Sequence, residues 1–155
     1  MQETIIKKTN QKKEALKIAE ELRYFFNKDG LKSLENDLKN HELYGAFINN
    51  TLVGFITFRK SDIASLEISW LAVKKEFQHT GVGTRLVKDS LNIFADSNYK
   101  ICYVKTLAET VKDDGYFKTR AFYKKLGFNT LEIISPYPGW TDENPCQILV
   151  AALPL

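Results

Sequence analysis

The sequence predicts an α/β (α+β) domain whose central sheet is mixed and mainly antiparallel. Two alternating segments, residues 43–48 and 52–58, flank Asn49-Asn50, and Asn tolerates the positive φ of a two-residue hairpin turn. Residues 66–73 are typical of a strand, and a glycine-containing turn leads from it into an amphipathic helix and then into the apolar strand 101–106. Because a strand–helix–strand crossover joins parallel neighbours, we expect these last two strands to be parallel.

The N-terminal third predicts a short strand and two helices. β-Branched residues favour a strand over 4–8, and Thr9 or Asn10 can cap the helix that follows. Apolar residues at helical spacing then predict a first helix that Gly30 ends and a shorter second helix. The first stripe contains Ala15, Ile18, Ala19, Leu22, Phe25 and Phe26, and the second contains Leu31, Leu34 and Leu38.

The C-terminal third predicts a helix and a terminal pair of strands. Residues 112–115 form a polar loop, and the helix around Tyr123 ends at Gly127, which can adopt the left-handed conformation that closes many helices. Residues 128–134 and 146–153 are typical strands, and the Pro-Gly-aromatic segment 135–140 between them is a loop. A polar turn at residues 60–62 precedes strand 66–73.

Composition predicts one domain over residues 1–155 and argues against a nucleic-acid partner, a metal site, a signal peptide and a membrane span. A net charge of +3, with basic and acidic residues mixed, is too small to argue for a nucleic-acid partner. Cys102 and Cys146 lie in apolar runs without metal-ligand spacing, which favours reduced core thiols in a cytoplasmic protein and no metal site. The start of the chain lacks the basic and apolar regions of a signal peptide, and no run approaches the roughly 18 apolar residues of a membrane span.

The turn at residues 78–84 is the strongest functional signal. A strand that enters a helix through a glycine turn presents backbone N–H groups and the positive end of the helix dipole to a phosphate. Gly81 and Gly83 leave room for such a ligand and permit positive φ. The run lacks the Lys-Ser/Thr of a P-loop, and Leu86 stands where a dinucleotide fingerprint needs its third glycine.

Two blocks resemble the GNAT superfamily of acetyl-CoA-dependent N-acetyltransferases. The first is Gln-x-x-Gly-x-Gly at residues 78–83, after a strand that ends Leu-Ala-Val. The second is Tyr-x-x-x-Gly-Phe at residues 123–128. The resemblance spans nearly the whole chain and implies a sheet of about seven strands, a size that is common for sheets.

The resemblance also implies acetyl-CoA as co-substrate, a primary amine as acceptor and direct attack of the amine on the thioester. The loop backbone would hold the pyrophosphate, Gln78 would brace the turn, and free backbone groups of the preceding strand would pair with pantetheine. The cofactor-binding residues that follow from this are Leu71, Val73, Gln78, His79, Thr80, Gly81, Val82, Gly83 and Thr84.

The resemblance assigns roles to two catalytic groups and leaves one contact open. Tyr123 would protonate the departing thiolate, with an ordinary packing role as the alternative. The N–H of Leu71 would stabilise the oxyanion. Many family members carry an Asn seven residues before this tyrosine, whereas this chain has Tyr116, which leaves Tyr116 and Thr119 as the two candidates for the pantetheine contact.

Glu67 is the candidate general base. Glu is disfavoured in strands, and by alternation Glu67 is expected on the same face as Ser69, Leu71 and Val73. An alkyl amine of pKa about 10.4 is neutral in roughly one molecule in 2,500 at pH 7, so a base matters most for such an acceptor. The alternative is an exposed Glu67 paired with a lysine.

Two other functional classes remain open. A domain that keeps the fold without catalysis would bind acyl-CoA and acetylate no amine. A protein or tRNA modifier would present a large acceptor surface. Glu109, Asp113 and Asp114 near the expected cleft favour a small cationic acceptor, and the sequence leaves open whether the chain forms a homodimer.

Overall fold

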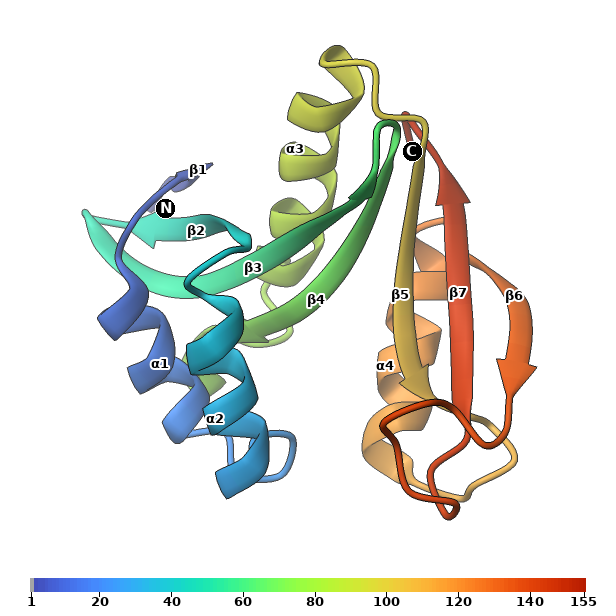
Figure 1. The fold of residues 1–155 in the computed structure, drawn as a ribbon. Helices are drawn as coiled ribbons and strands as arrows, with labels where there is room; N and C mark the ends of the chain where they lie inside the picture. The colour runs from blue at the N-terminus through green and yellow to red at the C-terminus, as the bar shows by residue number, and fades with distance from the viewer. Residues whose placement is uncertain (1) are drawn as a thin grey trace.

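The computed structural model describes residues 2–155, and its strands form one open sheet in the order β1-β2-β3-β4-β5-β7-β6 (Figure 1). All neighbours are antiparallel except β4 and β5, which confirms the predicted mixed, mainly antiparallel sheet. The strands are β1 (Thr4–Lys8), β2 (Glu42–Ile48), β3 (Thr51–Asp62), β4 (Ser65–Val73), β5 (Ile101–Leu107), β6 (Asn129–Ile134) and β7 (Cys146–Ala152).

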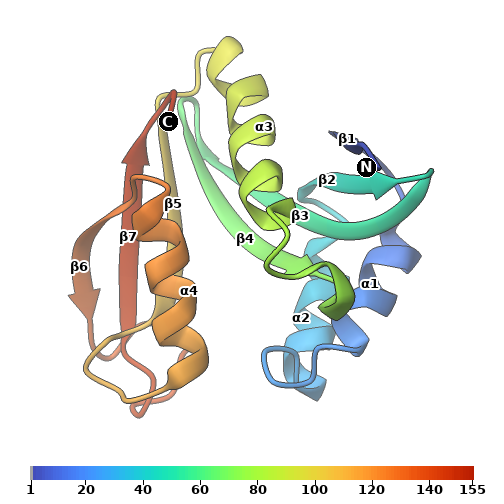
Figure 2. The ribbon, with the colours of Figure 1, turned by 180° about the vertical axis from the view of Figure 1, so that it is seen from behind.

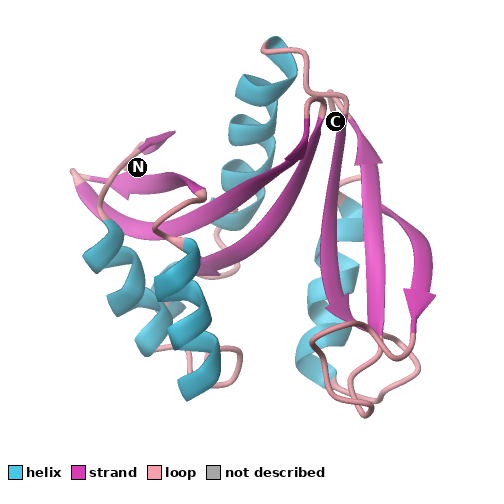
Figure 3. Ribbon diagram, viewed as in Figure 1, coloured by secondary structure: helices cyan, strands magenta, loops and turns pink. Residues whose placement is uncertain are grey.

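Helices cover both faces of the sheet (Figures 2 and 3). One apolar cluster joins α1 and α2 to one face, and another joins α3 and α4 to the opposite face. None of the helices in residues 2–155 is long and apolar enough to cross a membrane. Their bounds are α1 (Lys12–Glu20), α2 (Lys28–Asp37), α3 (Val82–Asp96) and α4 (Asp114–Lys125), with one 3₁₀ turn at Lys75–Phe77.

The local predictions at two turns are confirmed. Asn49 and Asn50 have φ values of 50° and 63°, so the β2–β3 hairpin uses left-handed residues at both turn positions. Gly127 follows α4 with φ of 104°, as expected for a helix-terminating glycine. These positions were predictable because the local backbone conformation selects the residue type.

Helix boundaries in the first third differ from the prediction. α1 ends at Glu20, and residues 21–27 form turns, so the apolar spacing beyond Glu20 belongs to a connecting segment. Gly30 lies inside the first turn of α2 and donates its N–H to the Asn27 side chain at 2.8 Å. Gly30 therefore does not end a helix, because the Asn27 cap starts the second one three residues earlier.

Two further boundaries are corrected by local hydrogen bonds. The residue that precedes α1 is Gln11, whose N–H donates to Thr9 Oγ1 at 3.2 Å, so Thr9 bonds next to the helix rather than capping it. Residues 114 and 115, expected in a loop, are helical because the Asp113 carboxylate accepts the Tyr116 N–H at 3.0 Å. The β3 strand also continues through residues 60–62 before it turns.

β4 and β5 pair over only four residues each. The parallel register joins residues 65–68 of β4 to residues 101–104 of β5, and it stops at Ile68 and Val104. Beyond that point the two strands diverge and the sheet opens (Figure 1). The sheet therefore consists of two halves joined at one end of the β4–β5 pair.

A β-bulge at Ser69 changes which side chains of β4 share a face. Trp70 pairs with Thr57 and Ile68 pairs with Phe58, so Ser69 is the additional residue. Ile68, Leu71 and Val73 accordingly pack with α3 and α4, whereas Trp70 packs with α1 and α2. The expectation that Glu67 shares a face with Leu71 and Val73 is wrong, because the bulge interrupts the strict alternation on which it depended.

Candidate active site

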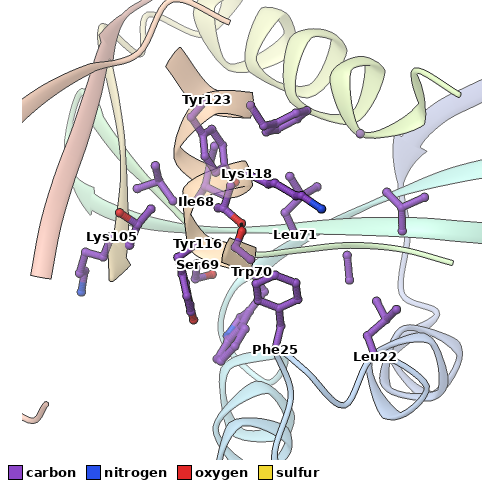
Figure 4. Close-up of a pocket in the computed structure, with 18 of the residues that line it drawn as sticks. Leu22, Phe25, Ile68, Ser69, Trp70, Leu71, Lys105, Tyr116, Lys118 and Tyr123 are labelled. Carbon is purple, nitrogen blue, oxygen red and sulfur yellow. Dashed lines mark hydrogen bonds between the residues drawn. The ribbon is translucent and has the colours of Figure 1, made fainter. Parts of the chain in front are cut away.

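A large open cleft lies where β4 and β5 diverge, between α4 and the α1–α2 side of the molecule (Figure 4). Both halves of the sheet contribute to its walls, together with the glycine turn at the start of α3. Its lining brings together nearly all residues that the sequence singled out, among them Glu67, Leu71, Val73, Gln78, Gly81 and Tyr123.

Backbone groups of β4 face this cleft without a strand partner. The N–H of Lys74 donates to Val53 O at 2.8 Å, so Lys74 belongs to a hydrogen-bonded pair with β3. Because antiparallel pairs alternate, the N–H and C=O groups of Leu71 and Val73 point away from β3. They point toward β5, whose pairing with β4 has already ended at Ile68. This edge can accept an extended ligand as an added strand.

The glycine turn brings free donors to the end of the same edge. Gly81 precedes α3 with φ of 90° and offers no side chain to cap it. The N–H groups of the first helical residues, Val82, Gly83 and Thr84, therefore have no partner within the helix. They lie at the positive end of the helix dipole, a combination that favours a phosphate group.

Side chains of the turn brace its backbone. Gln78 Nε2 donates to Val73 O at 2.9 Å and thereby joins the turn to the last residue of β4. The Thr80 hydroxyl donates to Phe77 O. His79 is exposed and has φ of 62°, so the turn holds a second left-handed residue two positions before Gly81. Only Gly81 of the two glycines needs its positive φ, because Gly83 already lies within α3.

Tyr123 lies on α4 and reaches the cleft beside Ile68 (Figure 4). Its side chain is almost entirely buried, and burial raises the pKa of the phenol strongly, with a smaller contribution from Cys102. The hydroxyl has no hydrogen-bond partner within residues 2–155, and Tyr123 borders the cleft. A phenol in this state remains protonated and has its donor available to a ligand.

Glu67 is buried and held by two cations. One oxygen accepts Arg59 Nε at 2.8 Å, and the other lies 3.0 Å from Lys105 Nζ. The bond to Glu67 raises the pKa of Arg59. Burial lowers the pKa of Lys105, but the interactions with Glu67 and Tyr137 together outweigh it, so the pKa of Lys105 is raised. Arg59 also donates to the Tyr103 hydroxyl at 2.8 Å. The carboxylate is thus fixed in a charged cluster at the point where β4 and β5 separate.

Aromatic side chains from the α1–α2 connection meet α4 across the mouth of the cleft. The Tyr24 hydroxyl donates to Asp113 Oδ1 at 2.8 Å, and the rings of Phe25 and Tyr116 make an edge contact at 5.5 Å. Tyr116, the residue in place of the expected Asn, is half-buried here, and burial is the main cause that raises its pKa. The Thr119 hydroxyl donates to Gly115 O at 3.1 Å.

The sequence did not single out three further polar residues of the cleft, Asp37, His41 and Ser69. His41 gave only the weak signal of being one of two histidines in the chain. Its contact with Ser69 joins residues that are 28 positions apart. Within residues 2–155, no group of three or more His, Cys, Asp or Glu side chains is arranged to hold a metal ion.

The chain is similar to several solved structures over almost its whole length. A GNAT-family acetyltransferase from Desulfovibrio desulfuricans has a TM-score of 0.83 at 13% identity, covering 97% of this chain and 99% of that one. A GNAT acetyltransferase from Elizabethkingia anophelis with bound acetyl-CoA has a TM-score of 0.73 at 21% identity, covering 97% and 98%. The ribosomal-protein-S18-alanine N-acetyltransferase of Escherichia coli has a TM-score of 0.73 at 16% identity, covering 99% and 96%. The TM-scores show a shared fold, and at these sequence identities they show the fold alone.

Comparison of the sequence itself gives the family. No curated protein matches the chain. The model of the Acetyltransferase (GNAT) family matches residues 12–128, which include the glycine turn, both parallel strands and the Tyr-x-x-x-Gly-Phe block. The chain therefore belongs to the Acetyltransferase (GNAT) family.

Proposed function

We propose that this protein transfers the acetyl group of acetyl-CoA to a primary amine of a small acceptor by direct attack. The observation that carries the proposal is the continuity of two features, the β4 edge at Leu71 and Val73, which has no strand partner, and the free N–H groups at the start of α3. The first suits the amides of pantetheine and the second suits a pyrophosphate. Acetyl-CoA contains both groups in that order.

The proposed reaction forms one bond and breaks another. The neutral amine attacks the thioester carbonyl, the new C–N bond forms, and the C–S bond breaks. The Leu71 N–H, which points into the cleft, is the proposed donor to the developing oxyanion. The Tyr123 hydroxyl, which is buried and protonated, gives its proton to the departing thiolate and recovers one from solvent.

The amine must also lose a proton. Glu67 remains the predicted base, acting directly or through a water molecule. Both of its oxygens already interact with cations, Arg59 and Lys105, so the amine or a water molecule would have to compete with these interactions.

Three aspartates of the cleft would contact a small cationic acceptor. They are Asp37, Asp113 and Asp114, and they line the cleft together with several lysines. Glu109, which the sequence also suggested, is not among the lining residues. The Tyr24–Asp113 contact narrows the mouth, which favours a small acceptor over a folded protein surface.

An amine panel tests the proposal. Release of CoA from acetyl-CoA would be followed with a thiol reagent in the presence of spermidine, kanamycin or a peptide with a free N-terminal alanine. Calorimetry with CoA would be run in parallel. Turnover with at least one of the two small amines supports the proposal. CoA binding without turnover indicates a non-catalytic domain, and turnover with the peptide alone assigns the activity to protein acceptors.

A further inference from the structure

A chain of polar contacts extends from the β4 bulge to α2 along one wall of the cleft. Ser69, the bulge residue, lies in the cleft beside Ile68 and Trp70 (Figure 4). Its hydroxyl is 2.8 Å from His41 Nδ1 and 2.7 Å from Thr57 Oγ1. On the far side of the imidazole, His41 Nε2 lies 3.7 Å from Asp37 Oδ1.

Packing fixes the far end of this chain. Trp70 Nε1 donates to Asp37 Oδ2 at 2.8 Å, and the Trp70 ring stacks at a tilt on Phe26 at 5.4 Å. The two residues that follow one another at the bulge, Ser69 and Trp70, therefore hold both ends of the Asp37–His41 pair. Bulges re-aim side chains in this way next to active sites.

The arrangement selects one tautomer of His41. The Asp37 carboxylate favours a proton on the nitrogen that faces it, Nε2. Nδ1 then carries a lone pair and accepts the Ser69 hydroxyl proton. Thr57 can donate to Ser69 Oγ at the same time, so the serine oxygen keeps one lone pair for a donor in the cleft.

We propose that Ser69 and His41 form the proton exit for the acceptor amine, with Asp37 as a positioning residue. As the C–N bond forms, the amine proton passes to Ser69 Oγ, and the Ser69 proton passes to His41 Nδ1. The resulting imidazolium is paired with Asp37 and later gives its proton to solvent. This inference rests on the proposed acetyl transfer and puts the Ser69–His41 pair in place of Glu67 as the acceptor of the amine proton.

The charges around His41 are compatible with this role. Asp37 faces it from α2, and Glu67 of β4 lies on the same face of the sheet but is neutralised by Arg59 of β3 and Lys105 of β5. The His41 side chain is about nine-tenths buried, with an exposed fraction of 12%. Imidazole is the side chain that can take up and release a proton near neutral pH.

Three variants and one control test the relay kinetically, with the best amine of the panel as acceptor. We expect kcat/KM of the wild type to rise with pH through one ionisation near neutrality. Ser69→Ala and His41→Gln should lower kcat roughly 10²-fold or more, and His41→Gln should lose that ionisation. Exogenous imidazole should restore part of the activity of His41→Gly. Ser65→Ala, on the same strand outside the cleft, should behave like the wild type.

The variant Glu67→Gln tests the alternative that Glu67, rather than the relay, is the base. If Glu67→Gln keeps the ionisation in its pH profile, the relay is supported. If Glu67→Gln loses the ionisation and His41→Gln keeps it, the relay is overturned and Glu67 is the base. If the wild type acetylates amines and Ser69→Ala keeps its rate, the relay is wrong while the acetyl transfer stands. If the wild type acetylates none of the amines, the proposed function itself fails.

The tautomer of His41 can be measured without any acceptor, and it tests the hydrogen bond from Ser69 to His41 Nδ1. Long-range ¹H–¹⁵N spectra resolve Nδ1 and Nε2 of the two histidines, and His79→Gln assigns the remaining signals to His41. We expect His41 to be the Nε2–H tautomer in the neutral protein and to lose that preference in Asp37→Asn. A proton on Nδ1 in the wild type would exclude transfer from Ser69 and overturn the inference.

Discussion

Replacing Gly81 by alanine tests the phosphate site at the start of α3. Gly81 has φ of 90°, and a Cβ added there would have no atom within 4 Å, so the cost of alanine comes from the backbone conformation alone. A left-handed conformation costs a non-glycine residue about 1–2 kcal/mol. If CoA binds only the left-handed turn, the dissociation constant should rise about 5- to 30-fold. A β-branched residue, as in Gly81→Val, should abolish measurable binding.

Two matched glycine variants separate strain from recognition. Gly139 in the β6–β7 loop has φ of 85° and equally open surroundings, so Gly139→Ala should lose a similar free energy of unfolding and keep its CoA affinity. A Cβ on Gly83 would lie 3.5 Å from the Phe122 ring, an ordinary contact, so Gly83→Ala should fold normally. Weaker CoA binding in Gly83→Ala would then report close approach of the ligand.

Calorimetry with CoA gives the dissociation constant of each variant, and thermal unfolding of the same samples gives its stability. The reasoning is refuted if Gly81→Ala keeps the wild-type stability, so that its turn has relaxed from the left-handed conformation, and still binds CoA with the wild-type dissociation constant. In that case the turn is a strand-to-helix connection with no part in binding.

Three other predictions concern the proposed general acid Tyr123, the charged cluster around Glu67 and the ion pair between Glu42 and Lys8. Tyr123→Phe should keep CoA affinity and lower kcat roughly 10²-fold, and a wild-type rate would make Tyr123 a packing residue. Glu67→Gln leaves Arg59 and Lys105 without their shared anion, so the KM for a cationic acceptor should rise. The bond to Lys8 lowers the pKa of Glu42, so Glu42 binds fewer protons when folded, and its stabilising effect should be lost as pH falls below 4.5. Acid titration of thermal stability should show a smaller loss in Glu42→Gln than in the wild type.

The sequence predicted those parts of the fold that depend on local pattern. The β2–β3 hairpin, the glycine after α4 and the parallel β4–β5 pair follow from residue types and periods that act over a few positions. The bond of Gln78 to Val73 is also local, since it spans five residues, but its bracing role was inferred from the family resemblance. Short-range geometry makes such features readable before any tertiary contact is known.

Features that depend on register could not be read in this way. The bulge at Ser69 arises from the pairing of β4 with β3, and it moves Glu67 to the opposite face from Leu71. The approach of His41 to Ser69 needs α2 and β2 to be placed against β4. The first helix was predicted too long, since the apolar residues Leu22 and Phe25 lie in turns beyond the end of α1.

Because β4 separates from β5, a bound cofactor should also hold the two halves of the sheet together. Four residue pairs at one end of these strands carry the backbone connection between the two halves of the sheet, and the Tyr24–Asp113 and Phe25–Tyr116 contacts bridge the opposite side. A ligand that fills the gap supplies the missing strand and crosslinks the halves. CoA should therefore slow amide hydrogen exchange in β5 and α4 together, and at 100 times its dissociation constant it should raise the free energy of unfolding by about 2.7 kcal/mol.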